Sequence, residues 1–262
     1  MSLFHDIIEG FFFPSDRRDY WKPEHYGLKG HAFTCPHPAG HTLNGYLFLS
    51  GTQETKGRVL FCHSGLFNRE FNLPQVLFLI DAGYEVVSFD YSGYGLSGGK
   101  SRLDGLLADL EAVVHYDSEE NRFQGPYIIF AQGIGCDAAM QFYHAHRSHV
   151  SMLILESMYY SRKGWIKDRW GPLVGDIGAA MLETTSIEPE AVLPEIHVPL
   201  LMVYPESGKY IRKSERLKVS SHLPKHALLW TVPKTQSFGI FNTHNGTWSI
   251  KALSFIEKKT KK

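Results

Sequence analysis

Four side chains of the types used in hydrolytic chemistry stand far apart in this sequence. Cys62 and Ser64 supply a thiol and a hydroxyl, His244 supplies an imidazole, and Glu206 supplies a carboxylate. A thiol or hydroxyl attacks a carbonyl carbon efficiently only when a base within hydrogen-bonding distance takes its proton, and an acid often orients that base. If the fold brings the four residues together, they are a nucleophile, a base and a displaced acid. If it does not, they are a buried thiol and ordinary loop residues.

Short apolar runs indicate the elements that would position these side chains. The runs lie at 58–62, 85–89, 126–130, 151–155, 199–204 and 227–232, and they are typical of strands buried on both faces of a sheet. Between them, Leu103 to Tyr116 carries apolar residues at the three-to-four spacing of a helix. This alternation predicts an α/β protein with a mostly parallel central sheet and helices on both faces. Ligands bind such sheets at the carboxyl ends of the strands.

One of the predicted strands leads into a turn rich in glycine. The segment Ile128 to Cys136 reads Ile-Ile-Phe-Ala-Gln-Gly-Ile-Gly-Cys, which predicts a strand, a sharp turn and the start of a helix. Upstream, 58–65 ends in Cys-His-Ser-Gly, and 90–97 reads Asp-Tyr-Ser-Gly-Tyr-Gly-Leu-Ser. In this order the three pieces resemble the α/β-hydrolase superfamily, whose G-x-S-x-G elbow presents a nucleophilic serine above the sheet. Phe-Phe-Phe-Pro-Ser at 11–15, followed by paired strands at about 26–35 and 41–50, is similar to the Bem46-like branch.

The resemblance implies a catalytic triad whose three positions are all substituted in this chain. The nucleophile position of the elbow is Gly133, the acid position after the next-to-last strand is Gly208, and the histidine position after the last strand is Ser237. Glycine accepts the positive φ of an elbow without strain, but it has no atom that could attack a substrate. The chain is therefore expected to be a pseudo-hydrolase.

The same resemblance implies a binding site where the active site would stand. Backbone amides at Ile134 and in the loop after His63 are expected to face a ligand, and a helix N-terminus attracts negative charge without any triad. We expect a small apolar or carboxylate-bearing ligand there, no cofactor and no metal, with His63 as a structural hydrogen-bonding residue. The predicted ligand-binding residues are His63, Ser64, Gly65, Leu66, Gln132, Gly133 and Ile134.

Two functions remain open at this stage. The first is a catalytically inactive homologue that acts through ligand binding or protein interaction, with no particular protein partner indicated. The second is an ester, thioester or acyl hydrolase with a relocated nucleophile, Cys62 or Ser64, and His244 as its base. A purely structural partner protein would be favoured if bulky side chains fill the pocket.

Composition sets the outer bounds. With 262 residues and 43% hydrophobic content, the chain is expected to form a single domain over 1–262. Segment 1–25 is expected to pack on the core, in preference to touching a membrane surface, and 158–195 is expected to form a small cap. Balanced charges, 27 basic against 27 acidic residues, argue against nucleic acid. Three widely spaced cysteines and no apolar stretch of membrane-spanning length fit a cytoplasmic protein.

Overall fold

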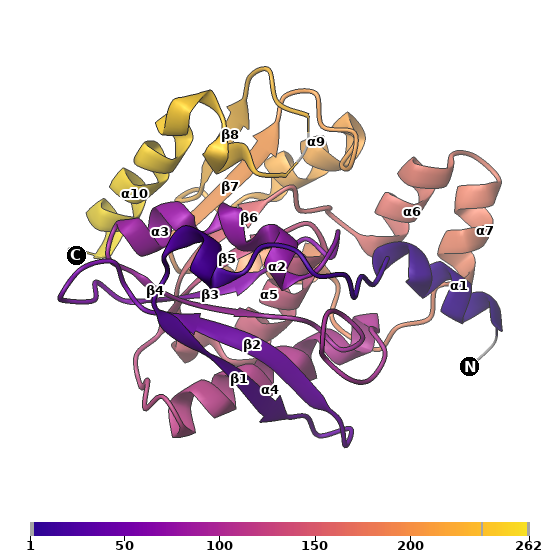
Figure 1. Cartoon of the computed structure of the whole chain (residues 1–262). Helices are drawn as coiled ribbons and strands as arrows, with labels where there is room; N and C mark the ends of the chain where they lie inside the picture. Colours follow the sequence, from indigo (N-terminus) through magenta and orange to yellow (C-terminus); the bar gives the residue numbers. More distant parts are fainter. Residues whose placement is uncertain (1–2, 237, 261–262) are drawn as a thin grey trace.

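The computed structural model describes residues 3–236 and 238–260, and these form one mixed sheet with helices on both faces (Figure 1). The sheet order is β1-β2-β4-β3-β5-β6-β7-β8. Strand β2 runs antiparallel to β1 and β4, and the pairs from β4 to β8 are parallel. The strands are β1 (Gly30–Pro36), β2 (Thr42–Phe48), β3 (Arg58–Cys62), β4 (Glu85–Phe89), β5 (Tyr127–Gln132), β6 (Val150–Glu156), β7 (Leu200–Pro205) and β8 (Leu228–Val232).

The apolar runs predicted as strands correspond to β3 to β8, and the predicted mostly parallel sheet is confirmed. The runs at 58–62 and 85–89 match β3 and β4 residue for residue. The two N-terminal strands are shorter than predicted. Strand β1 begins at Gly30 because a 3-10 turn, Pro23–Tyr26, ends on Gly27 in the left-handed conformation and breaks the extended chain.

The helices divide between the two faces of the sheet (Figure 1). Helices α4 and α5 pack on one apolar core, which takes Leu60 and Cys62 from β3. Helices α3 and α10 pack on the other, which takes Val59 and Phe61 from the same strand. The helices are α1 (Leu3–Phe12), α2 (Arg69–Asn72), α3 (Leu77–Asp81), α4 (Leu106–Glu119), α5 (Ile134–Ala145), α6 (Arg162–Trp170), α7 (Val174–Met181), α8 (Pro189–Val192), α9 (Lys213–His222) and α10 (Thr247–Thr260).

The segment predicted as a cap, 158–195, contains α6, α7 and α8, and α1 lies against α7. A buried ion pair joins α6 to the first turn of α5: Arg162 Nε and Nη2 each lie 2.7 Å from an oxygen of Asp137, and neither side chain is exposed. Phe12 of α1 is buried with its ring centroid 4.7 Å from that of Trp165. None of the described helices is long and apolar enough to cross a bilayer.

Candidate functional site

The turn between β5 and α5 has the backbone shape of a nucleophile elbow. Gly133 adopts φ 54° and ψ −119°, a conformation that strains any residue with a Cβ. Its amide donates to the Glu156 carbonyl of the neighbouring strand at 2.9 Å. Two residues later, Gly135 lies so close to β3 that a Cβ would stand 2.1 Å from the Cys62 carbonyl oxygen. The sharp turn is therefore fixed by the packing of α5 on the sheet.

An aromatic ring covers the position where the elbow would present its side chain. A Cβ placed on Gly133 would lie 2.9 Å from Phe238 Cζ and 3.2 Å from the Ser64 carbonyl oxygen. The Phe238 ring packs edge-on against Tyr210, with centroids 4.8 Å apart, and Tyr210 in turn contacts Trp165 of the cap. Bulky side chains thus occupy the space above the turn, which is the condition under which we expected a purely structural partner protein to be favoured. No motif in the sequence pointed to Phe238.

The loop after β3 meets the elbow as expected, but its amides are already engaged. Gly65 and Ile134 are so close that a Cβ on Gly65 would lie 2.5 Å from Ile134 Cγ2. The Gly65 amide donates to His63 Nδ1 and the Leu66 amide donates to Ser64 Oγ, both at 3.2 Å. The predicted ligand-binding residues therefore come together as a packed contact, with a carbonyl and not an amide turned toward Gly133.

His63 is fully buried under this loop. Its ring centroid lies 4.6 Å from that of Tyr91, and burial, followed by the charge of Arg69, lowers the pKa of His63 to about 3. Because Nδ1 accepts the Gly65 amide, the neutral ring carries its proton on Nε2, which has no hydrogen-bond partner among the described residues. This geometry supports the structural role predicted for His63, because Nδ1 is held by the Gly65 amide and the lowered pKa makes the ring a weak base.

A buried carboxylate that sequence reasoning missed lies beside the elbow. Glu156 ends β6; its Oε2 accepts from Gln132 at 2.8 Å, and its Oε1 accepts the amides of Gly239 and Ile240 at 2.9 and 3.2 Å. Burial raises the pKa of Glu156 to about 7, against the lowering effect of these hydrogen bonds. Glu156 thus ties the elbow strand to the loop that carries Phe238.

Three comparisons with known proteins agree with this architecture. The family model described as serine aminopeptidase, S33, matches residues 53–178. The structure of an esterase from Pyrococcus furiosus superposes with a TM-score of 0.76 at 16% identity, over 94% of this chain and 97% of the esterase. The α/β hydrolase GrgF from Penicillium superposes with a TM-score of 0.67 at 13% identity, over 88% and 99%.

The chain has an α/β-hydrolase fold. Its sequence is also 24% identical over 260 residues to the uncharacterized protein YfhR of Escherichia coli O157:H7, covering 95% of this chain and 87% of YfhR. Together with the family match, the fold supports a place in the α/β-hydrolase superfamily. Structural similarity at these identities establishes the fold alone.

Gly208 and Ser237 are the other two residues that the sequence predicted at triad positions. Gly208 lies in the turn after β7, beside a hollow of about 650 Å³ lined by Arg169, Lys209, Arg212, Lys213 and Ser214. Ser237 lies outside the described residues.

The structure does not bring Cys62, Ser64, Glu206 and His244 together as a set of hydrogen-bonded side chains among the described residues. Among the described residues, His244 donates from Nε2 to the Pro233 carbonyl at 2.8 Å, and Glu206 accepts the Lys234 amide at 3.1 Å. Both side chains are exposed. Cys62 is fully buried, and burial raises the pKa of its thiol. No hydrogen bond joins His244 to Cys62 or Ser64 in the part of the chain that the structure describes.

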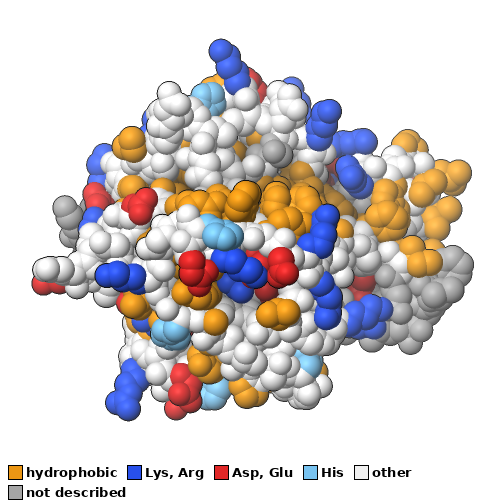
Figure 2. Space-filling model, in the orientation of Figure 1, with side chains coloured by type: hydrophobic (Ala, Val, Ile, Leu, Met, Phe, Trp, Pro, Cys, Tyr) orange, Lys and Arg blue, Asp and Glu red, His pale blue; other side chains and the backbone are white. Residues whose placement is uncertain are grey.

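The predicted cap segment, 158–195, offers a different kind of surface. An apolar groove of about 510 Å³ lies between α1 and α7, lined by Ile7, Ile8, Phe11, Trp170, Val174, Ile177, Gly178 and Met181. Phe11, Val174 and Ile177 are 52, 58 and 53% exposed. Figure 2 shows hydrophobic side chains gathered at the right, where Figure 1 places α6 and α7. Exposed apolar patches of this kind mark binding surfaces more often than single exposed residues do.

Proposed function

We propose that this chain is a catalytically inactive α/β-hydrolase homologue that binds an apolar ligand in the groove between α1 and α7. The observation that carries the proposal is the Phe238 ring above Gly133, in the space where the side chain of a nucleophile would stand. A substrate carbonyl would have to displace that ring and would still meet no hydroxyl or thiol on the elbow.

The chemistry around the elbow supports inactivity. Acyl transfer needs a nucleophile, a base within hydrogen-bonding distance and amides that stabilise the oxyanion. Gly133 supplies no nucleophile, His63 is a buried neutral ring, and the Leu66 amide is bonded to Ser64 Oγ. The described residues at the elbow therefore offer no nucleophile and no strong base, and the Leu66 amide is already engaged.

The groove supports the choice of ligand. Its volume lies within the usual range of small-molecule sites, and its lining is almost wholly apolar. Phe11 and Trp170, which both line the groove, pack edge to face with their ring centroids 4.6 Å apart. Lys167 of α6 is paired with Asp176 of α7 at 2.9 Å, so the apolar lining of the groove, and not an unpaired charge beside it, indicates the class of ligand. The carboxylate site predicted at the elbow amides stays a prediction.

A relocated hydrolase is the second candidate, and the family match and the esterase structure favour it. It requires Cys62 or Ser64 to be activated by His244. Burial of the Cys62 thiol and the hydrogen bond from His244 to Pro233 both work against that arrangement.

One experiment separates the two candidates. Purified protein is treated with a reactive fluorophosphonate and with iodoacetamide, its intact mass is measured, and turnover of short activated esters is assayed. We expect neither a fluorophosphonate adduct nor saturable turnover, and slow alkylation of the buried cysteines. A single stoichiometric adduct with turnover that disappears in Ser64→Ala or Cys62→Ala would establish the relocated hydrolase and overturn the inactive one.

Ligand binding in the groove is tested by titrating dodecanoate while tryptophan fluorescence is recorded. We expect a saturable change that is at least about tenfold weaker in Ile177→Asp, because the new carboxylate lies in the apolar lining and repels the head group. Ile250→Asp is the matched control, since Ile250 is 67% exposed on α10. Equal affinity in both variants would place the ligand elsewhere.

A further inference from the structure

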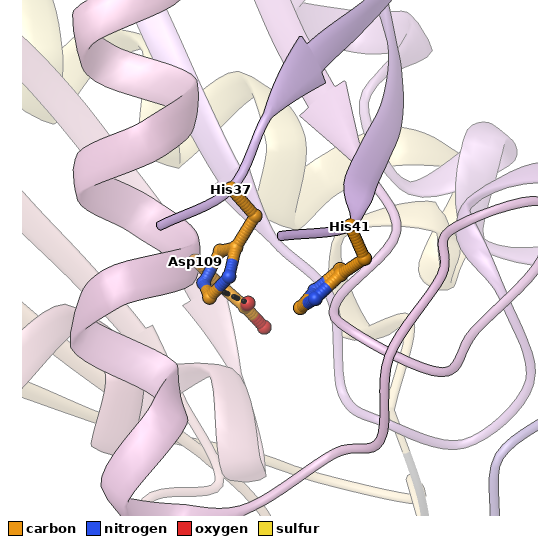
Figure 3. A group of neighbouring side chains, drawn as sticks. All are labelled: His37, His41 and Asp109. Atoms are coloured by element: carbon orange, nitrogen blue, oxygen red, sulfur yellow. Dashed lines mark ion pairs between the residues drawn. The ribbon is translucent and has the colours of Figure 1, made fainter. Parts of the chain in front are cut away.

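Three side chains with metal-binding atoms meet at the end of the β1–β2 hairpin, away from the elbow and the groove. His37 and His41 flank the hairpin turn, which is closed by the His37 amide donating to the His41 carbonyl at 2.8 Å. Asp109 reaches them from α4. Figure 3 shows the two rings lying side by side with the carboxylate next to them; the ring centroids are 4.2 Å apart and the planes differ by 24°.

The spacing of the three groups suits one small cation. His37 Nε2 lies 3.3 Å from Asp109 Oδ1, and one ligand atom from each of the three residues lies within 4.8 Å of the others. Two ligand atoms that each lie about 2.0–2.2 Å from a tetrahedral zinc ion are about 3.3–3.6 Å apart. The His37–Asp109 pair already has that separation, and His41 needs only a small ring movement.

The burial of the cluster is the second observation. His37 is 9% exposed and Asp109 is 2% exposed, while His41 is half-buried. Although His37 Nε2 lies close to Asp109, the contact is not aligned as a hydrogen bond, so this buried nitrogen has no hydrogen-bond partner among the described residues. Buried ring nitrogens are normally paired with a protein group, a water or an ion.

We propose that His37, His41 and Asp109 bind a divalent transition-metal ion, with Zn²⁺ as the best match. Two imidazoles and one carboxylate are a typical zinc donor set, whereas Mg²⁺ and Ca²⁺ prefer oxygen ligands throughout. Three protein ligands leave the fourth position to a water molecule. The site lies beyond the proposed function and does not depend on it.

Binding exchanges hydrogen bonds that the cluster makes without metal. The Ala39 amide donates to His37 Nδ1 at 3.1 Å and must turn away when Nε2 becomes a ligand, because Nδ1 then carries the proton. His41 Nε2 must leave Ser92 Oγ, 2.8 Å away. Asp109 keeps the Ser92 amide on its other oxygen at 2.9 Å. Both imidazoles bind a metal ion in their neutral form.

A bound ion would connect three segments of the fold. The hairpin would be fixed to α4, and through Asp109 and Ser92 to the turn after β4. Without metal, the Asp109 carboxylate already holds the turn after β4, because it accepts hydrogen bonds from the amide and the hydroxyl of Ser92. Because the proposed ion would join these segments, the readouts of its binding are affinity and stability.

The test uses the full-length chain after removal of any affinity tag and dialysis against a chelator. Calorimetric titration with ZnCl₂ should give one equivalent at micromolar affinity or better, and the melting temperature should rise with zinc concentration. Co²⁺ in place of Zn²⁺ should give the intense visible bands of a four-coordinate ion. No binding in the micromolar range, or the weak bands of six-coordinate cobalt, would overturn the site.

Variants assign the binding to these residues. His41→Ala should weaken zinc binding at least about tenfold, and His41 is half-buried, so this variant should fold even where Asp109→Asn does not. His37→Ala should have the same effect. His31→Ala is the matched control, because His31 is an exposed histidine of the same hairpin bonded to Asn121. Unchanged affinity in both site variants, or equal weakening in the control, would overturn the proposal.

Discussion

The elbow and the groove between α1 and α7 are two regions of one fold that differ in how closely side chains pack there. At the elbow the backbone keeps its sharp turn, and Phe238 covers Gly133. Among the described residues that line the groove, Phe11, Val174 and Ile177 are about half exposed. The turn persists because α5 must pack on β3, whereas nothing in the packing requires exposed apolar side chains on the cap. Open apolar surface is therefore the better guide to function in this molecule.

The largest expected effect concerns the packing of the elbow. In Gly135→Ala the new Cβ would stand 2.1 Å from the Cys62 carbonyl oxygen, and backbone atoms cannot move aside cheaply. We expect the free energy of unfolding in urea to fall by about 3 kcal/mol or more.

The control is Gly10→Ala on α1, where a Cβ would meet nothing within 4 Å. Alanine is the better helix former, so this variant should be neutral or more stable by up to about 1 kcal/mol. A Gly135→Ala protein as stable as the parent would mean that the turn is not fixed by close packing.

The next effect depends on pH and concerns the carboxylate below Phe238. Burial raises the pKa of Glu156 from 4.5 to about 7, so the folded protein holds its proton more tightly than the unfolded chain does. The stabilising contribution is complete below pH 4.5 and is lost as the pH rises through 7, a change of about 3 kcal/mol. In Glu156→Gln this contribution should be absent.

The measurement is the difference in unfolding free energy between the parent and Glu156→Gln from pH 4.5 to 8. It should shift in favour of the variant as the pH rises. A difference that does not change over this range would show that Glu156 keeps an ordinary pKa and that the elbow is more hydrated than the structure indicates.

A third prediction sharpens the comparison by adding a side chain to the filled site. Gly133→Ser should lose about 1–3 kcal/mol of stability, partly from positive φ and partly from the Phe238 ring. Gly171→Ser is the matched control for strain alone, because Gly171 has φ 76° and open space around its Cβ position.

In a Phe238→Ala background, Gly133→Ser should be less harmful by about 1 kcal/mol, which a double-mutant cycle in urea measures. Strict additivity of the two substitutions would mean that the ring does not occupy the nucleophile position.

The smallest expected effect is on the stability of the groove. Ile177→Asp should change the free energy of unfolding by less than about 0.5 kcal/mol, since the side chain is 53% exposed, although it should weaken dodecanoate binding at least about tenfold. A large loss of stability on thermal unfolding would show that the groove belongs to the core and would remove the contrast with the elbow.

Much of the fold could be predicted from the sequence, because strands that are buried on both faces consist of short runs of apolar residues. Strands β3 and β4 were located residue for residue in this way. The turn at Gly133 was equally readable, since glycine at a strand-to-helix junction indicates positive φ. These features depend on neighbours in the chain, which the sequence displays directly.

The contents of the site were not readable, because they depend on partners distant in the chain. Phe238 lies in the loop after β8, and β8 stands three strands away from β5 in the sheet. The ring covers Gly133 only after the sheet has formed, so the sequence near Phe238 does not predict this contact. In the sequence, Glu156 is a polar residue at the end of a predicted strand. Only the folded chain brings the Gly239 amide to its carboxylate. His37 and His41 gain a common partner only when the hairpin docks on α4.

The ion pair between Arg162 and Asp137 bears on how this molecule opens. A cap in this position invites description as a hinged lid, yet its first helix is joined to the first turn of α5 by a pair with no exposed surface. Separating the two would leave an uncompensated charge in the interior, at about 3–5 kcal/mol. In native-state hydrogen exchange we therefore expect α6 and the start of α5 to lose protection together, as one cooperative unit. The segment 158–195 would then move little relative to α5. A ligand bound in the groove would slow hydrogen exchange at the start of α5 as well, because Arg162 joins the two helices.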